Sequence, residues 1–161
     1  MQNKKIDIFP ATAEDLEAIA EIESLSGLSH WGTESYKSEL AKDENLFYIA
    51  GSDGKVVGFV FARLIMPEVE IFNIAVLPEF RKQGIGRNLF ETILELAVDR
   101  GCLECWLEVR ESNLAARRFY EKLNFQNVGR RKNYYRFPVE DALLLGYKID
   151  NESCLKKEFE L

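Results

Sequence analysis

The sequence is poor in the residues that most often hold metals or form disulfide bonds. Among 161 residues there is one histidine and there are three cysteines, Cys102, Cys105 and Cys154. An odd number of widely spaced cysteines does not suggest a disulfide framework, and zinc would need further ligands from a chain with one histidine. Cys102 and Cys105 have the spacing of a redox or zinc motif, but they leave a predicted helix and enter a predicted strand, so core packing is the favoured interpretation. We expect no metal, and a reducing cytoplasm as the location.

Long apolar runs are also absent. No stretch approaches the roughly eighteen consecutive apolar residues of a membrane span, and residues 1–5 lead into a strand pattern without the apolar segment of a signal peptide. Basic residues are in deficit, because 21 Lys and Arg face 27 Asp and Glu, which gives a net charge of −6 and a pI near 5.0. We therefore expect neither a membrane nor direct nucleic acid as a partner, and the charge favours a basic protein or peptide.

What the chain does have is a core-forming composition and a regular succession of strand and helix patterns. Apolar residues make up 47% and aromatic residues 12%, enough for one buried core. The patterns predict strands at 6–9, 46–50, 56–62, 69–77, 103–109, 128–137 and 142–149, and helices at 12–25, 33–41, 84–101 and 113–123. The strands between 46 and 77 are expected to form an antiparallel meander. We predict one mixed α/β domain over residues 1–149, followed by a polar tail, 150–161, to which no structure is assigned.

The most informative segment is residues 77–87. A strand ends there, and Gly84 and Gly86 open a strongly amphipathic helix, with three basic residues between positions 81 and 87. A helix start presents unpaired amides at the positive end of the helix dipole, and glycine lets a phosphate approach the backbone closely. The segment predicts a pyrophosphate site. On the glycine spacing alone, an ordinary helix start with solvated charges stays open as the alternative.

Two better-known phosphate loops are excluded. The dinucleotide-binding fingerprint needs a third glycine where Leu89 stands. The nucleoside-triphosphate loop needs a Gly-Lys pair followed by Ser or Thr, whereas Gly54-Lys55 is followed by Val56.

Several further motifs accompany the glycine loop. They are Phe72-Asn73-Ile74-Ala75-Val76, Arg81-x-x-Gly84-x-Gly86, Leu107-Glu108-Val109-Arg110-Glu111-Ser112-Asn113, Phe119-Tyr120-Glu121-Lys122-Leu123-Asn124-Phe125, Arg131-Lys132-Asn133-Tyr134-Tyr135 and Glu140-Asp141-Ala142. Together they resemble the GNAT superfamily of acetyl-CoA-dependent N-acetyltransferases, and within it the bacterial ribosomal-protein alanine N-acetyltransferases. The resemblance covers about residues 6–149. The glycine loop alone is shared across the superfamily, whereas the whole ordered set is far more specific.

The resemblance implies a fold and a cosubstrate. The GNAT fold has a central mixed, mostly antiparallel twisted sheet, flanked by helices and splayed at the cofactor site. The cosubstrate is acetyl-CoA, with its pantetheine arm along one strand, its pyrophosphate at the glycine loop and its thioester near Asn113. The cofactor-binding residues implied in this way are Ile74, Ala75, Val76, Lys82, Gln83, Gly84, Ile85, Gly86, Arg87 and Asn113.

The resemblance also implies that Glu108 is the general base and Tyr120 the general acid of direct acetyl transfer. Asn113 and Tyr120 are seven residues apart, or two helical turns, so both can face one ligand. A carboxylate suits an α-amino group, whose pKa of about 7.7–8.0 lies below the 10.4 of lysine, and a tyrosine can protonate a departing thiolate. Without the resemblance, Glu108 would be interpreted as a solvated strand residue and Tyr120 as a core or rim residue.

The acceptor implied by the resemblance is the N-terminus, alanine first, of a basic ribosomal protein. Trp31, Asn73, Tyr134 and Tyr135 are its implied contacts. Two alternatives stay open. One is the same chemistry on a small amine or a lysine side chain, and the other is a non-catalytic acyl-CoA-binding or partner-binding module, which would need neither an acid nor a base. We expect a monomer or a weak dimer.

Overall fold

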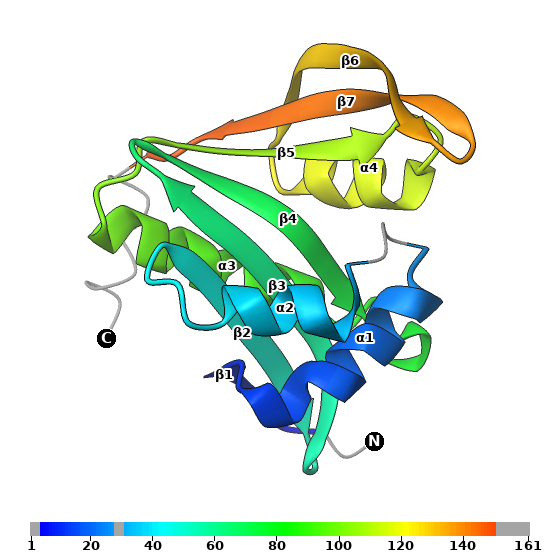
Figure 1. Cartoon of the computed structure of the whole chain (residues 1–161). Coiled ribbons are helices and arrows are strands. Elements are labelled where there is room, and N and C mark those ends of the chain that lie inside the picture. Colours follow the sequence, from blue (N-terminus) through cyan, green and yellow to red (C-terminus); the bar gives the residue numbers. More distant parts are fainter. Residues whose placement is uncertain (1–3, 28–30, 151–161) are drawn as a thin grey trace.

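The computed structural model describes residues 4–27 and 31–150, and its central feature is one seven-stranded sheet (Figure 1). The strands lie in the order β1-β2-β3-β4-β5-β7-β6. Neighbouring strands are antiparallel, except that β4 and β5 run parallel. The strands are β1 (Ile6–Pro10), β2 (Asn45–Ser52), β3 (Lys55–Ile65), β4 (Glu68–Val76), β5 (Glu104–Arg110), β6 (Gln126–Arg136) and β7 (Val139–Lys148). This mixed, mostly antiparallel sheet confirms the predicted fold class.

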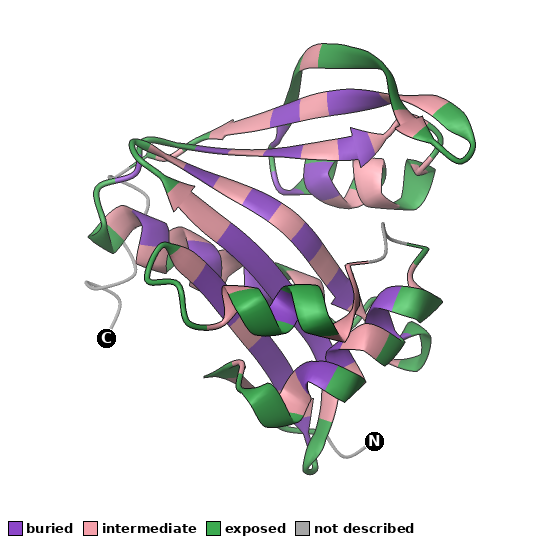
Figure 2. Ribbon diagram, viewed as in Figure 1, coloured by how far each residue is buried: buried purple, intermediate pink, exposed green. Residues whose placement is uncertain are grey.

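Helices cover the sheet on both faces. Figure 1 shows α1 and α2 in front of the strands β2–β4 and α3 behind them, with α4 beside β5. Because both faces are covered, residues 57–62 of β3 are buried without interruption, whereas β6, at the edge, is exposed along most of its length (Figure 2). The helical segments are η1 (Ala13–Asp15), α1 (Leu16–Leu25), α2 (Gly32–Glu39), η2 (Pro78–Phe80), α3 (Ile85–Asp99) and α4 (Leu114–Lys122).

Local sequence accounts for most turns. Asp53 and Gly54 have φ angles of 51° and 78°, the left-handed pair that a two-residue hairpin needs, and they join β2 to β3 as predicted. Asn124 has a φ of 69° and ends α4. Cys102 and Cys105 are buried in the core, which confirms the packing interpretation for both.

The strands β4 and β5 separate partway along β4, and this opens the sheet. Only Glu68–Ile71 of β4 pair with Glu104–Leu107 of β5, and beyond this point β4 pairs with β3 alone. Figure 1 shows the two strands diverging toward the end of β4 that leads to α3. A β-bulge leaves Phe72 without a partner on β3 at the point of separation. The splayed sheet that the resemblance implies is therefore confirmed.

The second helix differs from its predicted position. The sequence predicts a helix over 33–41 capped by Thr33, whereas α2 spans Gly32–Glu39 and its N-cap is Trp31. The cause is a long-range contact, because the amides of Trp31 and Gly32 donate to the carboxylate of Glu23, eight and nine residues earlier. No local capping pattern reveals such a contact. Of the predicted tail, residues 151–161 lie outside the described residues.

Neither a membrane span nor a metal cluster is found in the part of the chain that the structure describes. No helix in residues 4–27 or 31–150 has the length and apolar character to cross a bilayer. The same residues contain no group of three His, Cys, Asp or Glu that could hold a metal ion.

Phe61 tests how far the core depends on its aromatic cluster. Its side chain is fully buried, and its ring centroid lies 5.2 Å from those of Trp31 and Phe47. We expect Phe61→Ala to lower the free energy of unfolding by about 3–5 kcal/mol, and Phe61→Leu by about 1 kcal/mol, as measured by urea denaturation. A loss below about 1 kcal/mol for Phe61→Ala would show that the neighbouring rings fill the space.

Candidate active site

The loop before α3 presents backbone amides beside the opened sheet. Lys82 and Gly84 have φ angles of 60° and 81°, and the first α-helical bond of α3 runs from the Asn88 amide to the Gly84 carbonyl at 3.0 Å. The amides that precede Asn88 in α3 have no partner within the helix. Lys82 and Arg87 are exposed, whereas the Ile85 side chain is buried and leaves only its amide for a ligand. Amides and cations at the positive end of a helix suit an anion.

Two other side chains of this loop hold it in place. Nε of Arg81 donates to the carbonyl of Val76 at 2.9 Å, and Nε2 of Gln83 donates to the carbonyl of Glu79 at 3.3 Å. The loop is therefore tied to the end of β4. The Gln83 side chain is occupied by this contact, so its backbone is the part that can meet a ligand.

The free edge of β4 faces the gap. The amide of Leu77 donates to the carbonyl of Val57 at 2.8 Å, which fixes the phase of the antiparallel ladder between β3 and β4. Because such ladders alternate, the amides and carbonyls of Ile74 and Val76 point away from β3, and those of Ala75 point toward it. Because the Val76 carbonyl already accepts from Arg81, the amides of Ile74 and Val76 and the carbonyl of Ile74 are the groups with which this segment can pair with an extended ligand.

Helix α4 closes the same side of the gap. Oδ1 of Asn113 caps the helix by accepting a bond from the Ala116 amide at 3.1 Å, which leaves the amide nitrogen of Asn113 as a donor for a ligand. The ring of Phe119 packs against the backbone of Gly86, where an added Cβ would lie 3.1 Å from Cζ of that ring. A glycine is needed at position 86 because α3 and α4 approach so closely.

Tyr120 lies on the buried face of β5. Its side chain is buried, and its ring centroid lies 5.1 Å from that of Phe119 and 5.4 Å from that of Phe125. Burial, with a smaller effect of Cys105, raises the pKa of the phenol above its usual value, so the hydroxyl keeps its proton. Cys105 and Glu108 are three positions apart on β5 and therefore face opposite sides of the sheet. Tyr120 and Glu108 accordingly lie on opposite sides of β5.

Glu108 is not a solvated strand residue. Its side chain is 14% exposed, and its Oε1 lies 2.6 Å from Nε of Arg131. A hydrogen bond to Glu108, together with burial, raises the pKa of Tyr134. The ring of Tyr135 lies 4.0 Å from the guanidinium of Arg110, and burial, followed by the charge of Glu108, raises the pKa of Tyr135 to about 12. Strand β6 therefore supplies three partners around one carboxylate.

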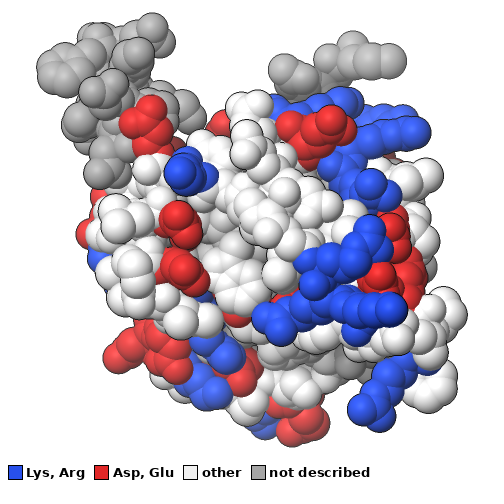
Figure 3. Space-filling view, turned by 90° about the horizontal axis from the view of Figure 1, so that it is seen from above, with Lys and Arg blue, Asp and Glu red and all other residues white. Residues whose placement is uncertain are grey.

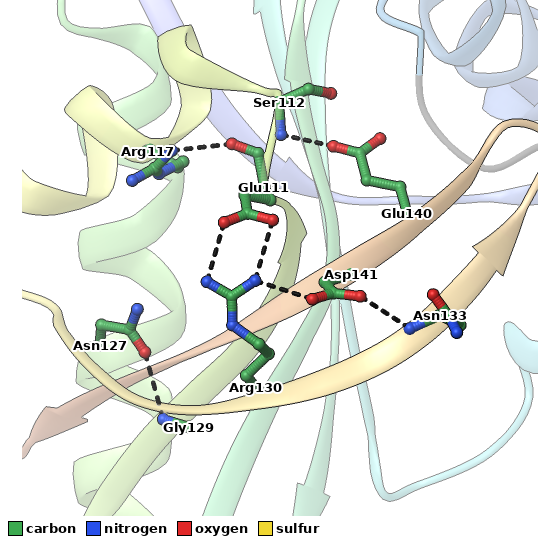
Figure 4. Close-up of polar contacts among 9 residues, drawn as sticks. All are labelled: Glu111, Ser112, Arg117, Asn127, Gly129, Arg130, Asn133, Glu140 and Asp141. Atoms are coloured by element: carbon green, nitrogen blue, oxygen red, sulfur yellow. Dashed lines mark hydrogen bonds and ion pairs between the residues drawn. The ribbon is translucent and has the colours of Figure 1, made fainter.

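A polar network fixes the loops that carry these residues (Figure 4). Arg130 on β6 makes two bonds to the carboxylate of Glu111, at 2.8 and 2.9 Å, and one to Asp141 at 2.7 Å. The carboxylate of Glu140 accepts a bond from the Ser112 amide. The β5–α4 loop is thus held to the β6–β7 hairpin, and the start of α4 is held relative to Arg131 and the tyrosines of β6.

Sequence reasoning missed Glu70, on β4. Burial, followed by the charge of Glu108, raises the pKa of this carboxyl group to about 7. Glu70 pairs in register with Arg63 on β3, but the guanidinium of Arg63 is bound to Glu39 and Asn45. Within residues 4–27 and 31–150, Glu70 makes no hydrogen bond or ion pair. The signal that could have found it is a carboxylate at an alternate position of a strand in the middle of the sheet.

The expected acceptor contacts differ in burial and in their neighbours. Tyr134 and Tyr135 lie around Glu108, whereas the carboxamide of Asn73 is buried, with its Nδ2 2.6 Å from the Tyr36 hydroxyl. The bulge at Phe72 places Asn73 opposite Phe61, on the face of the sheet that carries Tyr36. The carboxamide of Asn73 is therefore engaged inside the protein, and its expected contact with the acceptor stays a prediction.

Trp31, the fourth expected contact, stands beside the bulge. Its ring centroid lies 5.5 Å from that of Phe72 and 5.2 Å from that of Phe61, edge to face in both cases. It also stacks on Tyr36 at 5.7 Å. Trp31 thus forms an aromatic wall at the start of α2.

The charge of the chain is unevenly distributed. Residues 110–136, which include α4 and the whole of β6, carry eight Lys or Arg and two acidic residues. Figure 3 shows Lys and Arg gathered along one side of the molecule, with a largely uncharged area beside them. The expectation of no direct nucleic-acid binding, which rests on the average charge, stays a prediction.

A cavity of about 530 Å³ lies apart from these residues. It is open to solvent and is lined by residues of α4, β6 and β7, among them Leu114, Gln126 and Leu145. None of the expected catalytic or cofactor-binding residues lines it. The candidate site is therefore the opened sheet itself.

The geometry is that of an acyl-transferring enzyme with a splayed sheet, and comparison with known proteins identifies the family. Residues 16–125 match the acetyltransferase (GNAT) family, and the chain belongs to it. The chain is 34% identical over 137 residues to the [ribosomal protein bS18]-alanine N-acetyltransferase of Escherichia coli K12. The aligned region covers 84% of this chain and 92% of that protein. These findings confirm the predicted superfamily and show that the chain is an acetyltransferase.

Solved structures agree with this assignment. The crystal structure of the ribosomal-protein-S18-alanine N-acetyltransferase from Escherichia coli is similar with a TM-score of 0.81 and 32% identity, over 91% of this chain and 95% of that one. Ard1 from Thermoplasma volcanium is similar with a TM-score of 0.85 and 26% identity, over 91% and 99% of the two chains.

The raised pKa of Glu70 predicts a pH-dependent stability. A carboxyl group with a pKa near 7 instead of 4.5 binds its proton more tightly in the folded protein, so its contribution to stability is complete below pH 4.5 and is lost as the pH rises through 7. Glu70→Gln removes this titration. We expect the Tm of Glu70→Gln minus that of the wild type to increase between about pH 5 and about pH 8, as measured by thermal unfolding. Glu68→Gln on the same strand is the control, and a Tm difference independent of pH would contradict the assignment.

Proposed function

We propose that the chain transfers an acetyl group from acetyl-CoA to the N-terminal amine of a ribosomal protein, with alanine as the first residue. One observation carries the proposal: the opened sheet has a helix start with amides that suit a phosphate and a free strand edge on one side, and Glu108 with its partners on the other. The similarity to a relative named for bS18 supports the choice of acceptor.

Acetyl-CoA, which GNAT acetyltransferases use, fits the residues present. The amides and cations of residues 82–87 suit its pyrophosphate. The backbone of Ile74 and Val76 suits the amides of its pantetheine arm, and the nitrogen of Asn113 can donate to it near the thioester. When bound, the coenzyme supplies an acetyl group activated as a thioester.

The two candidate catalytic side chains divide proton transfer between the two sides of β5. The carboxylate of Glu108 accepts a proton from the acceptor ammonium, directly or through a water. The phenol of Tyr120 stays protonated and can donate its proton to the departing thiolate on the other side of β5. Burial raises the pKa of the phenol far above that of a carboxyl group, so the carboxylate does not take the proton of the acid.

Proton affinity favours an N-terminus over a lysine side chain. Deprotonating an α-amino group of pKa about 7.7–8.0 at neutral pH costs roughly 1 kcal/mol, whereas a lysine of pKa 10.4 costs roughly 4–5 kcal/mol. A carboxylate that is already paired with Arg131 is adequate for the first task and weak for the second.

The shape of the acceptor side favours a peptide over a small amine. At the β6–β7 turn, Phe137 is 90% exposed, Val139 67% and Tyr134 50%. Exposed apolar side chains that cluster beside a site are typical of a surface that a larger partner covers. A small amine would leave them uncovered.

Glu108 is tested by Glu108→Gln. We expect the turnover rate to fall by about 10²–10⁴, because the amide cannot accept the proton of the amine, while binding of acetyl-CoA is retained. The measurements are steady-state kinetics and calorimetry. Glu104→Gln, at the exposed start of the same strand, is the control. Wild-type turnover in Glu108→Gln would remove the assignment.

Tyr120 is tested in the same way by Tyr120→Phe, which keeps the ring and removes the hydroxyl. A fall of about 10²–10⁴ in rate is expected if the phenol is the general acid. Tyr48→Phe on β2 is the matched control. Equal activity of the two variants would show that Tyr120 serves packing only.

The acceptor is tested with a panel of amines. We expect a peptide that begins with Ala to be acetylated with a kcat/KM at least about tenfold above that of the same peptide blocked at its N-terminus and carrying a free lysine, or of a polyamine. Mass spectrometry locates the acetyl group. Preference for the lysine or the polyamine would establish the alternative acceptor, and acetyl-CoA binding without transfer to any amine would establish a binding module.

A further inference from the structure

The last turn of α1 carries a buried carboxylate that the chemistry above does not use. Glu23 is fully buried. It accepts hydrogen bonds from the amides of Trp31, at 2.9 Å, and Gly32, at 3.2 Å, from the hydroxyl of Tyr36, and from Nδ2 of Asn73 at 3.3 Å. Burying a carboxylate is costly unless donors surround it. These four donors hold the Glu23 carboxylate in a fixed position, and the carboxylate in turn holds the groups that donate to it.

The donors come from two elements that form different sides of the site. Trp31 and Gly32 begin α2, where the helix dipole also favours a negative charge. Asn73 lies on β4, directly before the free edge at 74–76. The Tyr36 hydroxyl joins the two, because it also accepts a bond from Nδ2 of Asn73 at 2.6 Å.

A chain of contacts connects Trp31 with the carboxylates of the acceptor side. The Trp31 ring meets the Phe72 ring edge to face, and the Phe72 ring lies 5.1 Å from the guanidinium carbon of Arg63. Arg63 stands across from Glu70 in the β3–β4 ladder, and the charge of Glu108 acts on Glu70. Trp31 therefore stands on the side of the sheet where the acceptor amine would meet its base.

We propose that Glu23 is a positioning residue for the acceptor: its carboxylate fixes the start of α2 and so places Trp31 as a wall of the acceptor site. The inference rests on the proposed function for the identity of the acceptor, but the geometry stands without it. Glu23 touches no reacting atom and acts through Trp31. Strand β4 is also held by its ladder with β3, in which Asn73 pairs with Phe61, so loss of Glu23 leaves the cofactor edge in place.

Steady-state kinetics with a peptide that begins with Ala separates this role from a merely structural one. We expect Glu23→Ala to raise the KM for the peptide by about tenfold or more, and Glu23→Gln by about threefold, because its amide oxygen can still accept from the Trp31 and Gly32 amides. The KM for acetyl-CoA should stay within about twofold in both variants.

Tyr36→Phe is the matched control. It removes one donor to Glu23 and keeps the stacked ring and both amide bonds, so we expect a lower Tm with a peptide KM within about twofold of the wild type. A peptide KM and an acetyl-CoA KM that rise together in the Glu23 variants would overturn the proposal, as would a Tyr36→Phe variant that matches Glu23→Ala in peptide KM.

A second measurement does not need an acceptor. The chain has two tryptophans, Trp31 and Trp106. Among the described residues, 4–27 and 31–150, the buried Nε1 of Trp106 has no hydrogen-bond partner, so Trp106→Phe leaves Trp31 as the reporter. In this background we expect Glu23→Ala to shift the Trp31 emission to longer wavelength and to increase its quenching by acrylamide. If the wild type fails to acetylate the peptide but the emission shifts, the proposed acceptor is wrong and the placement of Trp31 by Glu23 stands. Unchanged emission and quenching in a folded Glu23→Ala variant would overturn the positioning role.

Discussion

The separation of β4 from β5 is the constraint on which the rest of the site depends. Two parallel strands that pair over four residues and then diverge leave backbone amides and carbonyls without ladder partners in the middle of the sheet. Such groups are costly to bury unpaired, so they need water or a ligand with matching polar groups. The α3 loop at the end of the same strand supplies amides for an anion. An extended ligand with amides along its length and a diphosphate at its end satisfies both demands.

The diverging strands also separate the chemistry into two compartments. On the face of β5 that carries Glu108, side chains from β3, β4 and β6 surround the carboxylate with alternating charges: Arg131 at 2.6 Å, Glu70 nearby, and Arg63 beyond it. On the other face, Tyr120 lies among aromatic rings. A charged environment suits an ammonium that must lose a proton, and an apolar one keeps a phenol protonated. The sheet provides both within the width of one strand.

The sequence predicted what depends on local pattern, and it failed where distant residues decide. The helix start at the glycine loop, the hairpin at Asp53 and the helix that begins after Asn113 follow from short-range rules and agree with the structure. The start of α2 does not, because it depends on a hydrogen bond from the Trp31 amide to Glu23, eight residues earlier. The bulge at Phe72 places Asn73 on the same face of the sheet as Phe61, which strand periodicity alone does not reveal. The raised pKa of Glu70 could not be predicted from the sequence, because it depends in part on Glu108, which lies on the neighbouring strand β5. The cytoplasmic location and the monomer or weak dimer stay predictions.

The edge strands of the sheet discourage pairing with another molecule, whereas the opened middle of the sheet offers backbone groups to a ligand. Strand β6, at one margin, has two register breaks and carries Arg130, Arg131, Lys132 and Arg136. At the other margin, β1 is five residues long and ends at Pro10, which has no amide to donate. Irregular, positively charged or proline-terminated margins discourage a strand of another molecule from extending the sheet. The backbone groups of the interior gap are thus better placed for recognition than those of the margins, and a narrow, extended molecule suits the gap.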